Sequence, residues 1–383
     1  MKKNRLIVLA SCFSLLIWSL FAFILPSGAI LCSAEGNLSQ TSAKAMCVVE
    51  MVSGRVLDEK NCDTLLPMAS TTKIMTALTA IENCDNLDES FEISPRSVGI
   101  SGTSIYLREG EHLSVRQLLY GLMLVSGNDA SVAIAEKVGG STKKFVDLMN
   151  ETARKIGAYN THFDNPHGLD SKTHYTTAKD LALITSYALK NPTFKEIVTT
   201  KNTKITSQEG KTRYLRNKNK LLFSLEGCIG VKTGFTDDAG RCLVSACEND
   251  NMGVVCVVLN CGPMFEESRQ LLETALDSYT LYDLTEDYNL PAAIAVENGK
   301  ASRVGIETKG EYYYPLSKEE KTKVKYVYNL SKSIEAPADK GTEIGDVQIF
   351  IDNDLHFSEK VYTIENVRRS SIWQNVKQFV DRW

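Results

Sequence analysis

The chain has 383 residues, with 43 Lys and Arg against 47 Asp and Glu, and a formal net charge of −4. At about 100 to 200 residues per domain this length predicts two or three domains, while 43% hydrophobic and 23% charged residues exclude wholesale disorder and fibrous repeats. No compact basic face is indicated, which argues against a nucleic-acid-binding protein.

The N-terminal segment up to Ala34 has the pattern of an export signal. Residues 2–5 carry three cations, and residues 6–25 form an uncharged run rich in Leu, Ile and Phe. Small residues suit cleavage after Ala34 or, as a second site, after Ala29. The apolar run approaches the ~20 residues that span a bilayer, so an uncleaved anchor is the alternative. In either case the rest of the chain is expected outside the cytoplasm.

The region that follows is predicted to mix strands and helices. Residues 47–57 indicate a β-hairpin with a Ser-Gly turn, and residues 240–261 indicate another. Strands near both ends of the region suggest one sheet assembled from distant segments. Ser70 is expected to cap a helix. The helices expected from apolar spacing are residues 70–82, 115–125, 130–138 (ended by Gly139 and Gly140) and 267–284.

The pattern of apolar and polar residues changes after about residue 290. Short alternating runs, such as residues 324–330 and 347–351, predict a small β domain. Between residues 367 and 383, six apolar residues fall on one helical face, and four cations stand against one acid. Two tryptophans lie on that face, so the tail is expected to be an amphipathic helix on a membrane surface; a plain core helix is the alternative.

Cysteines and histidines give little sign of metal chemistry. Eight of the ten cysteines follow Ala34, an even number that permits disulfides in an exported chain, although mostly free, buried thiols are expected. The five histidines are scattered without a ligand-like spacing. We therefore expect no metal site and no cofactor.

Three short motifs occur in order along the chain: Ser70-Thr-Thr-Lys73, Ser126-Gly-Asn128 and Lys232-Thr-Gly234. Each is weak alone, because Ser141-Thr-Lys-Lys144 also has serine and lysine three residues apart. Their conjunction is the pattern of penicillin-binding proteins and class A β-lactamases.

The chemistry of these residues supports the motifs. A spacing of three on a helix lets the Lys73 amine reach the Ser70 hydroxyl. A neutral amine can take the hydroxyl proton if burial and a second cation lower its pKa, and Lys232 is the natural second cation. Lys232 and Thr233 can hold a substrate carboxylate, while Gly234 lets the substrate lie close to the strand edge.

The remaining candidate residues complete an acyl-transfer site. Ser126 suits proton transfer to a leaving amine, and the amide of Asn128 can hold a substrate peptide group. Backbone N–H groups of Ser70 and Phe235 would form an oxyanion hole.

The sequence segments around the motifs resemble those of the D-alanyl-D-alanine carboxypeptidases, which are low-molecular-mass penicillin-binding proteins. The resemblance covers nearly all of the chain after the export signal, and residues 336–345 resemble a linker-to-strand word of that family's C-terminal β domain. The matching words are PMASTTKIMTA at 67–77, SGNDA at 126–130, NPHGL at 165–169 and GVKTGFTDDAGRCL at 230–243. We interpret residues 165–169 as a structural loop near the site.

The resemblance implies an α/β (α+β) serine DD-peptidase fold like that of β-lactamases, with helices on both faces of an antiparallel sheet. It implies removal of the terminal D-alanine from peptidoglycan pentapeptides, covalent inhibition by β-lactams at Ser70, and a location on the outer face of the bacterial cytoplasmic membrane. The expected division is a signal peptide (1–34), a DD-peptidase domain (35–288), a β domain (289–365) and a membrane-associated helix (366–383).

One departure keeps alternatives open. Members of the family usually have an arginine where this chain has Met264, and Arg241 or another cation would have to replace it. A class A β-lactamase is one alternative, although the Glu-x-x-Leu-Asn loop that it requires for deacylation is not found. The other is a protein that binds penicillin or peptidoglycan without turnover, but a pseudoenzyme has no physical reason to keep Lys73 and Lys232.

Overall fold

The computed structural model describes residues 41–250 and 252–370. The predicted export signal and residues 371–383 of the predicted tail helix lie outside the described residues. Residues 366–370, the expected start of that helix, are not helical, because Val367 and Arg369 form β-bridges with Ala338 and Gly299. Within the described part, no helix is both long and apolar enough to cross a membrane.

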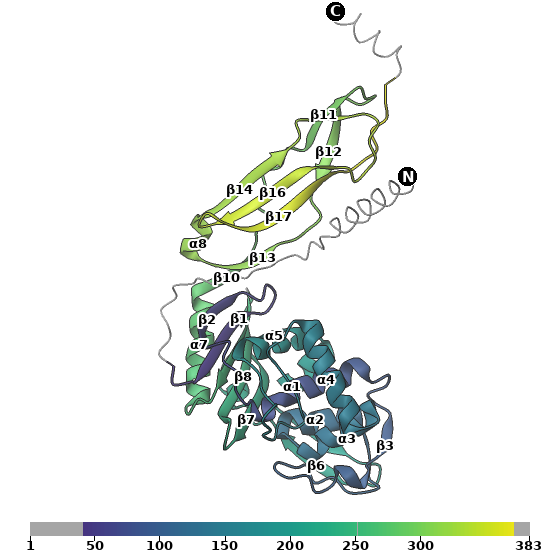
Figure 1. Cartoon of the computed structure of the whole chain (residues 1–383), viewed down its shortest axis with the longest axis vertical. Helices are drawn as coiled ribbons and strands as arrows, with labels where there is room; N and C mark the ends of the chain where they lie inside the picture. Colours follow the sequence, from purple (N-terminus) through teal and green to yellow (C-terminus); the bar gives the residue numbers. More distant parts are fainter. Residues whose placement is uncertain (1–40, 251, 371–383) are drawn as a thin grey trace, which may run out of the picture. The chain divides into compact units, whose positions relative to one another are not determined.

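The N-terminal part of the described chain is built on a five-stranded antiparallel sheet with the order β2-β1-β9-β8-β7 (Figure 1). Both predicted hairpins are confirmed, and β1 pairs with β9, so the sheet does join distant segments of the chain. β7 lies at the edge, which leaves one side of its backbone unpaired within this sheet. The strands are β1 (Ala45–Glu50), β2 (Val56–Lys60), β7 (Cys228–Thr236), β8 (Gly240–Glu248) and β9 (Gly253–Leu259).

Helices cover both faces of this sheet, as the resemblance implies. In β1, Ala45, Cys47 and Val49 point into one hydrophobic core, and the alternate residues Met46 and Val48 point into a second. Helix α7 (Met264–Ser278) packs in the second core, while the other helices of this region supply the first. Burial on both faces explains why these strands read as almost continuous apolar runs.

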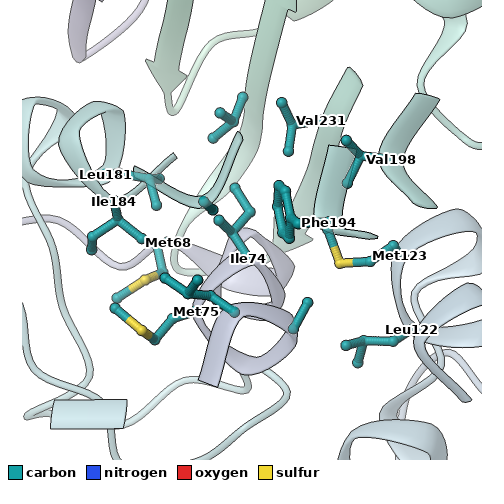
Figure 2. Packing of buried hydrophobic residues seen from close by; sticks show 14 of the residues in the cluster. Met68, Ile74, Met75, Leu122, Met123, Leu181, Ile184, Phe194, Val198 and Val231 are labelled. Atoms are coloured by element: carbon teal, nitrogen blue, oxygen red, sulfur yellow. The ribbon is translucent and has the colours of Figure 1, made fainter. Parts of the chain in front are cut away.

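Helix α1 lies at the centre of the first core, and every residue from 73 to 80 is buried. Figure 2 shows Ile74 and Met75 of α1 among apolar side chains contributed by several other elements. The helical elements around this core are η1 (Ala69–Thr72), α1 (Lys73–Asn83), α2 (Val115–Val125), α3 (Asn128–Gly139), α4 (Thr142–Ile156), α5 (Ala178–Leu189) and α6 (Pro192–Thr199).

Two of the predicted helices match closely, and two need correction. α2 and α3 form where expected, and Gly140 ends α3 in the left-handed conformation with φ 69°. Ser70 caps no helix, because it lies inside a 3-10 turn and α1 starts only at Lys73. The helix expected to reach residue 284 ends at Ser278, since the following five residues form strand β10.

Short elements complete the N-terminal part. They are two β-hairpins and two further 3-10 turns: β3 (Ser90–Glu92) with β4 (His112–Ser114), β5 (Asn202–Thr206) with β6 (Thr212–Arg216), η2 (Pro95–Ser97) and η3 (Lys220–Phe223).

The predicted C-terminal β domain is confirmed. Its six-stranded sheet has the order β14-β16-β17-β12-β11-β15, and β10 (Tyr279–Asp283) pairs separately with β13 (Tyr313–Ser317). Val347, Ile349 and Ile351 alternate along β16 and are buried. The remaining elements are β11 (Ala293–Glu297), β12 (Arg303–Glu307), α8 (Lys318–Thr322), β14 (Val324–Leu330), β15 (Ser333–Glu335), β16 (Glu343–Ile351) and β17 (Asp354–Thr363).

Candidate active site

Ser70 and Lys73 lie together at the junction between η1 and α1. The Lys73 Nζ atom is 2.9 Å from the Ser70 Oγ atom, as the spacing of three residues predicts. Lys73 is fully buried, whereas Ser70 is only partly buried. The pair therefore combines an accessible hydroxyl with an amine that is shielded from water.

Two further contacts orient the Lys73 amine. It donates to the Asn128 Oδ1 atom at 2.7 Å and to the His167 backbone oxygen at 2.6 Å, and both atoms can only accept. The Asn128 amide is oriented by its Nδ2 group, which donates to the Ser101 backbone oxygen at 2.6 Å. A neutral amine has two N–H groups and one lone pair, so these two acceptors leave the lone pair for the Ser70 hydroxyl.

The surroundings also favour the neutral amine. Burial, followed by the positive charges of Lys232 and Lys218, holds the pKa of Lys73 well below its usual range, against a smaller opposing effect of Asp129. Burial and the charge of Lys218 lower the pKa of Lys232 to about 7. Lys73 can therefore act as a proton acceptor near neutral pH.

Lys218 belongs to a group of cations beside the two motif lysines. Its backbone N–H donates to the Leu124 oxygen at the end of α2. It lines a cavity of about 530 Å³ together with Arg216, Lys220 and Phe223. The sequence motifs gave no indication of Lys218, although its charge lowers the pKa of both Lys73 and Lys232.

Lys232, Thr233 and Gly234 lie in the edge strand β7, as the motif predicts. Lys232 is buried, and its Nζ atom donates to the Thr233 backbone oxygen at 2.9 Å. A Cβ atom on Gly234 would lie 3.0 Å from the Met68 oxygen and 3.1 Å from the Ser70 nitrogen. Gly234 thus allows β7 to pack against the nucleophile's own backbone, a reason that the sequence did not reveal.

This close packing brings the Ser70 amide next to the chain around Phe235, where the oxyanion hole was predicted. Phe235 follows Gly234 directly in β7, and its side chain is 62% exposed. Its backbone belongs to the edge strand of the sheet. A carbonyl group bound along this edge would meet N–H groups from both elements.

Ser126 closes another side of the site. It follows α2 in the left-handed conformation with φ 69°, an uncommon geometry for a residue other than glycine. Its buried Oγ atom has no hydrogen-bond partner within the described residues. A buried, unpaired hydroxyl costs about 1–3 kcal/mol.

The segment 101–107 lies beside Asn128, and hydrogen bonds to Asp129 and Arg213 fix its position. Asp129 accepts hydrogen bonds from the backbone N–H groups of Ile105 and Leu107, both at 3.0 Å. Arg213 donates from Nε to the Ile105 oxygen at 2.7 Å. The sequence analysis missed both residues, although Asp129 directly follows the Ser-Gly-Asn motif.

The loop at residues 165–169 does more than border the site. The His167 oxygen binds Lys73, as described above, and Gly168 packs against η1 with φ +89°. A Cβ atom on Gly168 would lie only 1.9 Å from the Ala69 oxygen. The glycine in the sequence NPHGL could have indicated this close packing, because a positive φ and such close approach both exclude a side chain.

Neutral histidines support this loop. His174 Nδ1 accepts from the Asp164 backbone N–H at 3.0 Å, so Nε2 carries the proton and donates to Thr72 Oγ1 at 2.7 Å. Burial, followed by the charge of Lys73, lowers the pKa of His167 to about 4, and burial lowers the pKa of His174 to about 4. Neither ring adds a positive charge beside Lys73 at neutral pH.

The second Ser-x-x-Lys sequence has a structural role. Ser141 caps α4 by accepting from the Lys144 backbone N–H at 3.3 Å, and Lys144 is exposed. Arg241, the candidate replacement for the missing arginine, pairs with Phe235 across β7 and β8. Within residues 41–250 and 252–370, no group of three or more His, Cys, Asp and Glu side chains is arranged to hold a metal ion.

Comparisons with known families identify the family of the chain. Residues 32–262 match the family described as D-alanyl-D-alanine carboxypeptidase, and residues 279–369 match the C-terminal domain of penicillin-binding protein 5. The D-alanyl-D-alanine carboxypeptidase DacF of Bacillus subtilis is 31% identical over 89% of this chain and 90% of its own length. A D-alanyl-D-alanine carboxypeptidase of Streptomyces sp. strain K15 is 37% identical over 62% of this chain and 90% of its own.

Solved structures give the same result. Penicillin-binding protein 5 of Haemophilus influenzae has a TM-score of 0.73 at 28% identity, covering 86% of this chain and 98% of its own. The D-alanyl-D-alanine carboxypeptidase DacD of Francisella tularensis has a TM-score of 0.69 at 29% identity, with 89% and 96% covered. The fold, the motifs and these matches together show that this chain belongs to the D-alanyl-D-alanine carboxypeptidase family of low-molecular-mass penicillin-binding proteins.

Proposed function

We propose that this protein is a serine-type D-Ala-D-Ala carboxypeptidase that removes the terminal D-alanine of peptidoglycan pentapeptides through an acyl-enzyme at Ser70. The observation that carries this proposal is the contact of 2.9 Å between the Ser70 hydroxyl and a buried amine whose pKa is lowered. Two acceptors fix that amine, so its lone pair is directed at the hydroxyl. A serine is a competent nucleophile only with such a base beside it.

Acylation begins when Ser70 Oγ attacks the carbonyl carbon of the penultimate D-alanine. The hydroxyl proton passes to the Lys73 amine, and the carbonyl oxygen becomes an oxyanion. The N–H groups of Ser70 and Phe235 stabilise that oxyanion, because η1 and β7 are packed together at Gly234.

Collapse of this intermediate breaks the peptide bond. The leaving D-alanine amine takes a proton through Ser126, whose buried hydroxyl has no partner within the described residues and so is available for the relay. Water then attacks the ester, Ser70 is regenerated, and the shortened peptide leaves.

Substrate is held along the free edge of β7. Lys232 and Thr233 bind the terminal carboxylate, with Arg241 close to it on the neighbouring strand. Asn128 keeps one amide N–H for a substrate peptide group, since its other N–H binds Ser101 and its oxygen binds Lys73. A peptide in this position lies as an added strand, so backbone contacts supply affinity.

The test is release of free D-alanine from diacetyl-Lys-D-Ala-D-Ala by the purified protein, with Ser70→Ala as the control. Release that requires Ser70 supports a carboxypeptidase. Covalent labelling by a fluorescent penicillin without any D-alanine release would instead indicate a binding protein without turnover. Rapid hydrolysis of the penicillin without peptide turnover would indicate a β-lactamase.

Location follows from the residues at the two ends of the chain. We propose that the N-terminal signal exports the protein, that a DD-peptidase domain and a β domain follow it, and that a C-terminal helix binds the outer face of the cytoplasmic membrane. The positive charge and apolar face of residues 367–383 support this anchor. Deleting residues 370–383 should release signal-cleaved enzyme into the soluble fraction with its peptidase activity intact; a truncated enzyme that stays on the membrane would contradict the anchor.

A further inference from the structure

Two cysteines are register partners at one end of the β7–β8 ladder. Cys228 begins β7 and is the register partner of Cys247 in β8. The preceding pair is hydrogen-bonded, because the Glu248 N–H donates to the Gly227 oxygen at 2.9 Å, while the Cys228 N–H turns away to the Leu225 oxygen. Residues directly opposite each other in an antiparallel ladder have Cα atoms about 4.5–5.5 Å apart, and the register of this ladder shifts only beyond the pair, between Cys228 and Gly230.

That spacing lies inside the range that a disulfide can bridge, about 4.4–6.8 Å between Cα atoms. Both side chains also point to the same face of the sheet. Cys247 belongs to the core beneath α7, and Cys228 packs against that core, whereas the neighbouring Ala246 belongs to the core on the opposite face. Each of the two side chains shifts the pKa of the other, which indicates that the thiols lie close together, and the Cys228 Sγ atom also donates to the Gly230 oxygen at 3.6 Å.

The two thiols differ in access and acidity. Cys228 is partly exposed, and its pKa is lowered by the hydrogen bond from Cys247 and by the charges of Arg269 and Lys201, against the effect of burial. Cys247 is fully buried, and its hydrogen bond to Cys228 together with burial raises its pKa. Cys228 is thus the thiol that can attack an external disulfide, and Cys247 is the one that can complete the bridge.

A second close pair provides an internal comparison. Cys47 and Cys62 also lie close together, but both are buried, and Cys62 donates to the Glu59 carboxylate at 3.0 Å. The contact with Cys62, followed by burial, raises the pKa of Cys47. The thiols of this pair lie close together, but neither is accessible to an external oxidant.

We propose that Cys228 and Cys247 form a redox-modification site that takes a low-molecular-mass or protein disulfide as its oxidant. The Cys228 thiolate attacks one sulfur of the oxidant R–S–S–R, forming a mixed disulfide and releasing one thiolate. Cys247 gives up its proton and attacks the Cys228 sulfur, which releases the second thiolate. Two cysteine thiols and one external disulfide become one internal disulfide and two external thiols.

The bridge would act on the strand that carries the catalytic lysine. It ties the start of β7 to β8 four residues before Lys232, at the edge of the sheet, where β7 has only β8 as its partner. Exported proteins meet disulfide oxidants, whereas cytosolic thiols are kept reduced, so the export proposed above brings the pair to its oxidant. The geometry itself does not depend on the enzymatic activity.

The experiment uses the reduced full chain incubated with oxidised glutathione, then acid quenching, alkylation under denaturing conditions and peptide mapping without reduction. We expect the peptides of Cys228 and Cys247 to become linked while Cys47 and Cys62 remain alkylated. Closing a loop of about 20 residues should also raise the melting temperature by roughly 5 °C or more. Cys228 and Cys247 remaining free, or the buried pair oxidising first, would overturn the proposal.

Two variants test the order of the steps. Cys247→Ala should stop at a mixed disulfide between glutathione and Cys228, and Cys228→Ala should leave Cys247 unmodified because it is buried. Penicillin labelling of the reduced variants shows whether they are folded. If one variant is not folded, the peptide mapping of the wild-type protein still tests the proposal. A folded Cys228→Ala variant that is glutathionylated at Cys247 would refute the assignment of Cys228 as the attacking thiol.

Discussion

Gly168→Ala should impair acylation much more than its small size suggests. The new Cβ atom would lie 1.9 Å from the Ala69 oxygen, and contacts below 3.0 Å are essentially never tolerated, so this oxygen must retreat by about 1 Å. Ala69 directly precedes Ser70, and the loop that must yield carries the His167 oxygen that holds Lys73. Misplacement of a reacting group by about 1 Å can slow catalysis roughly 100-fold. We therefore expect acylation by a fluorescent penicillin to fall by about that factor.

Gly140→Ala is the matched control for this substitution. Gly140 has a similarly positive φ of 69°, but nothing lies within 4 Å of the position that a Cβ atom would take there. Both variants carry the conformational cost of a left-handed alanine, about 1–2 kcal/mol, and only Gly168→Ala adds the collision. Thermal unfolding and acylation rates should be measured together. Equal losses of stability, with acylation of Gly168→Ala within threefold of wild type, would refute this account of the loop.

Four further substitutions address the nucleophile, its base and the neighbouring cation. Ser70→Ala should abolish penicillin labelling with the fold intact, whereas Ser141→Ala should label like wild type; labelling that persists in the Ser70 variant would reject the nucleophile. Lys73→Arg should lose acylation although the charge is kept, because a guanidinium group cannot be deprotonated, and near wild-type rates would mean that another group takes the proton. Acylation requires neutral Lys73, so its rate should fall as the pH falls through the Lys73 pKa. Lys218→Gln removes a cation that lowers this pKa, so the acid limb of the pH profile should move to higher pH, and an unmoved limb would exclude that influence.

The sequence predicted the parts of the site that depend on local geometry. The spacing of Ser70 and Lys73 places them one turn apart in any helical conformation, so the pair forms even though the first turn is a 3-10 turn. That turn explains why the predicted cap failed. The Thr71 and Thr72 hydroxyls bond back to the Met68 and Ala69 oxygens, while Ser70 is left free to face Lys73.

What the sequence could not show depends on contacts between distant segments. The His167 oxygen is a backbone atom, so no side-chain pattern marks it as the partner of Lys73. The overextended helix has the same cause. Residues after Ser278 continue an apolar pattern, but they pair as a strand with residues 313–317, and this long-range partner is invisible to local periodicity.

Each of the three sequence motifs contains a residue that is locally unfavourable for stability. Lys73 and Lys232 are buried side chains that lose hydration, and Ser126 combines a left-handed backbone with a buried hydroxyl that has no partner in the described part of the chain. Each feature lowers stability, yet each supplies something that acyl transfer needs: a neutral amine, a tuned second cation and a free hydroxyl. A fold optimised only for stability would replace them with apolar or exposed residues, so their presence in the three motifs is accounted for by the proposed acyl transfer.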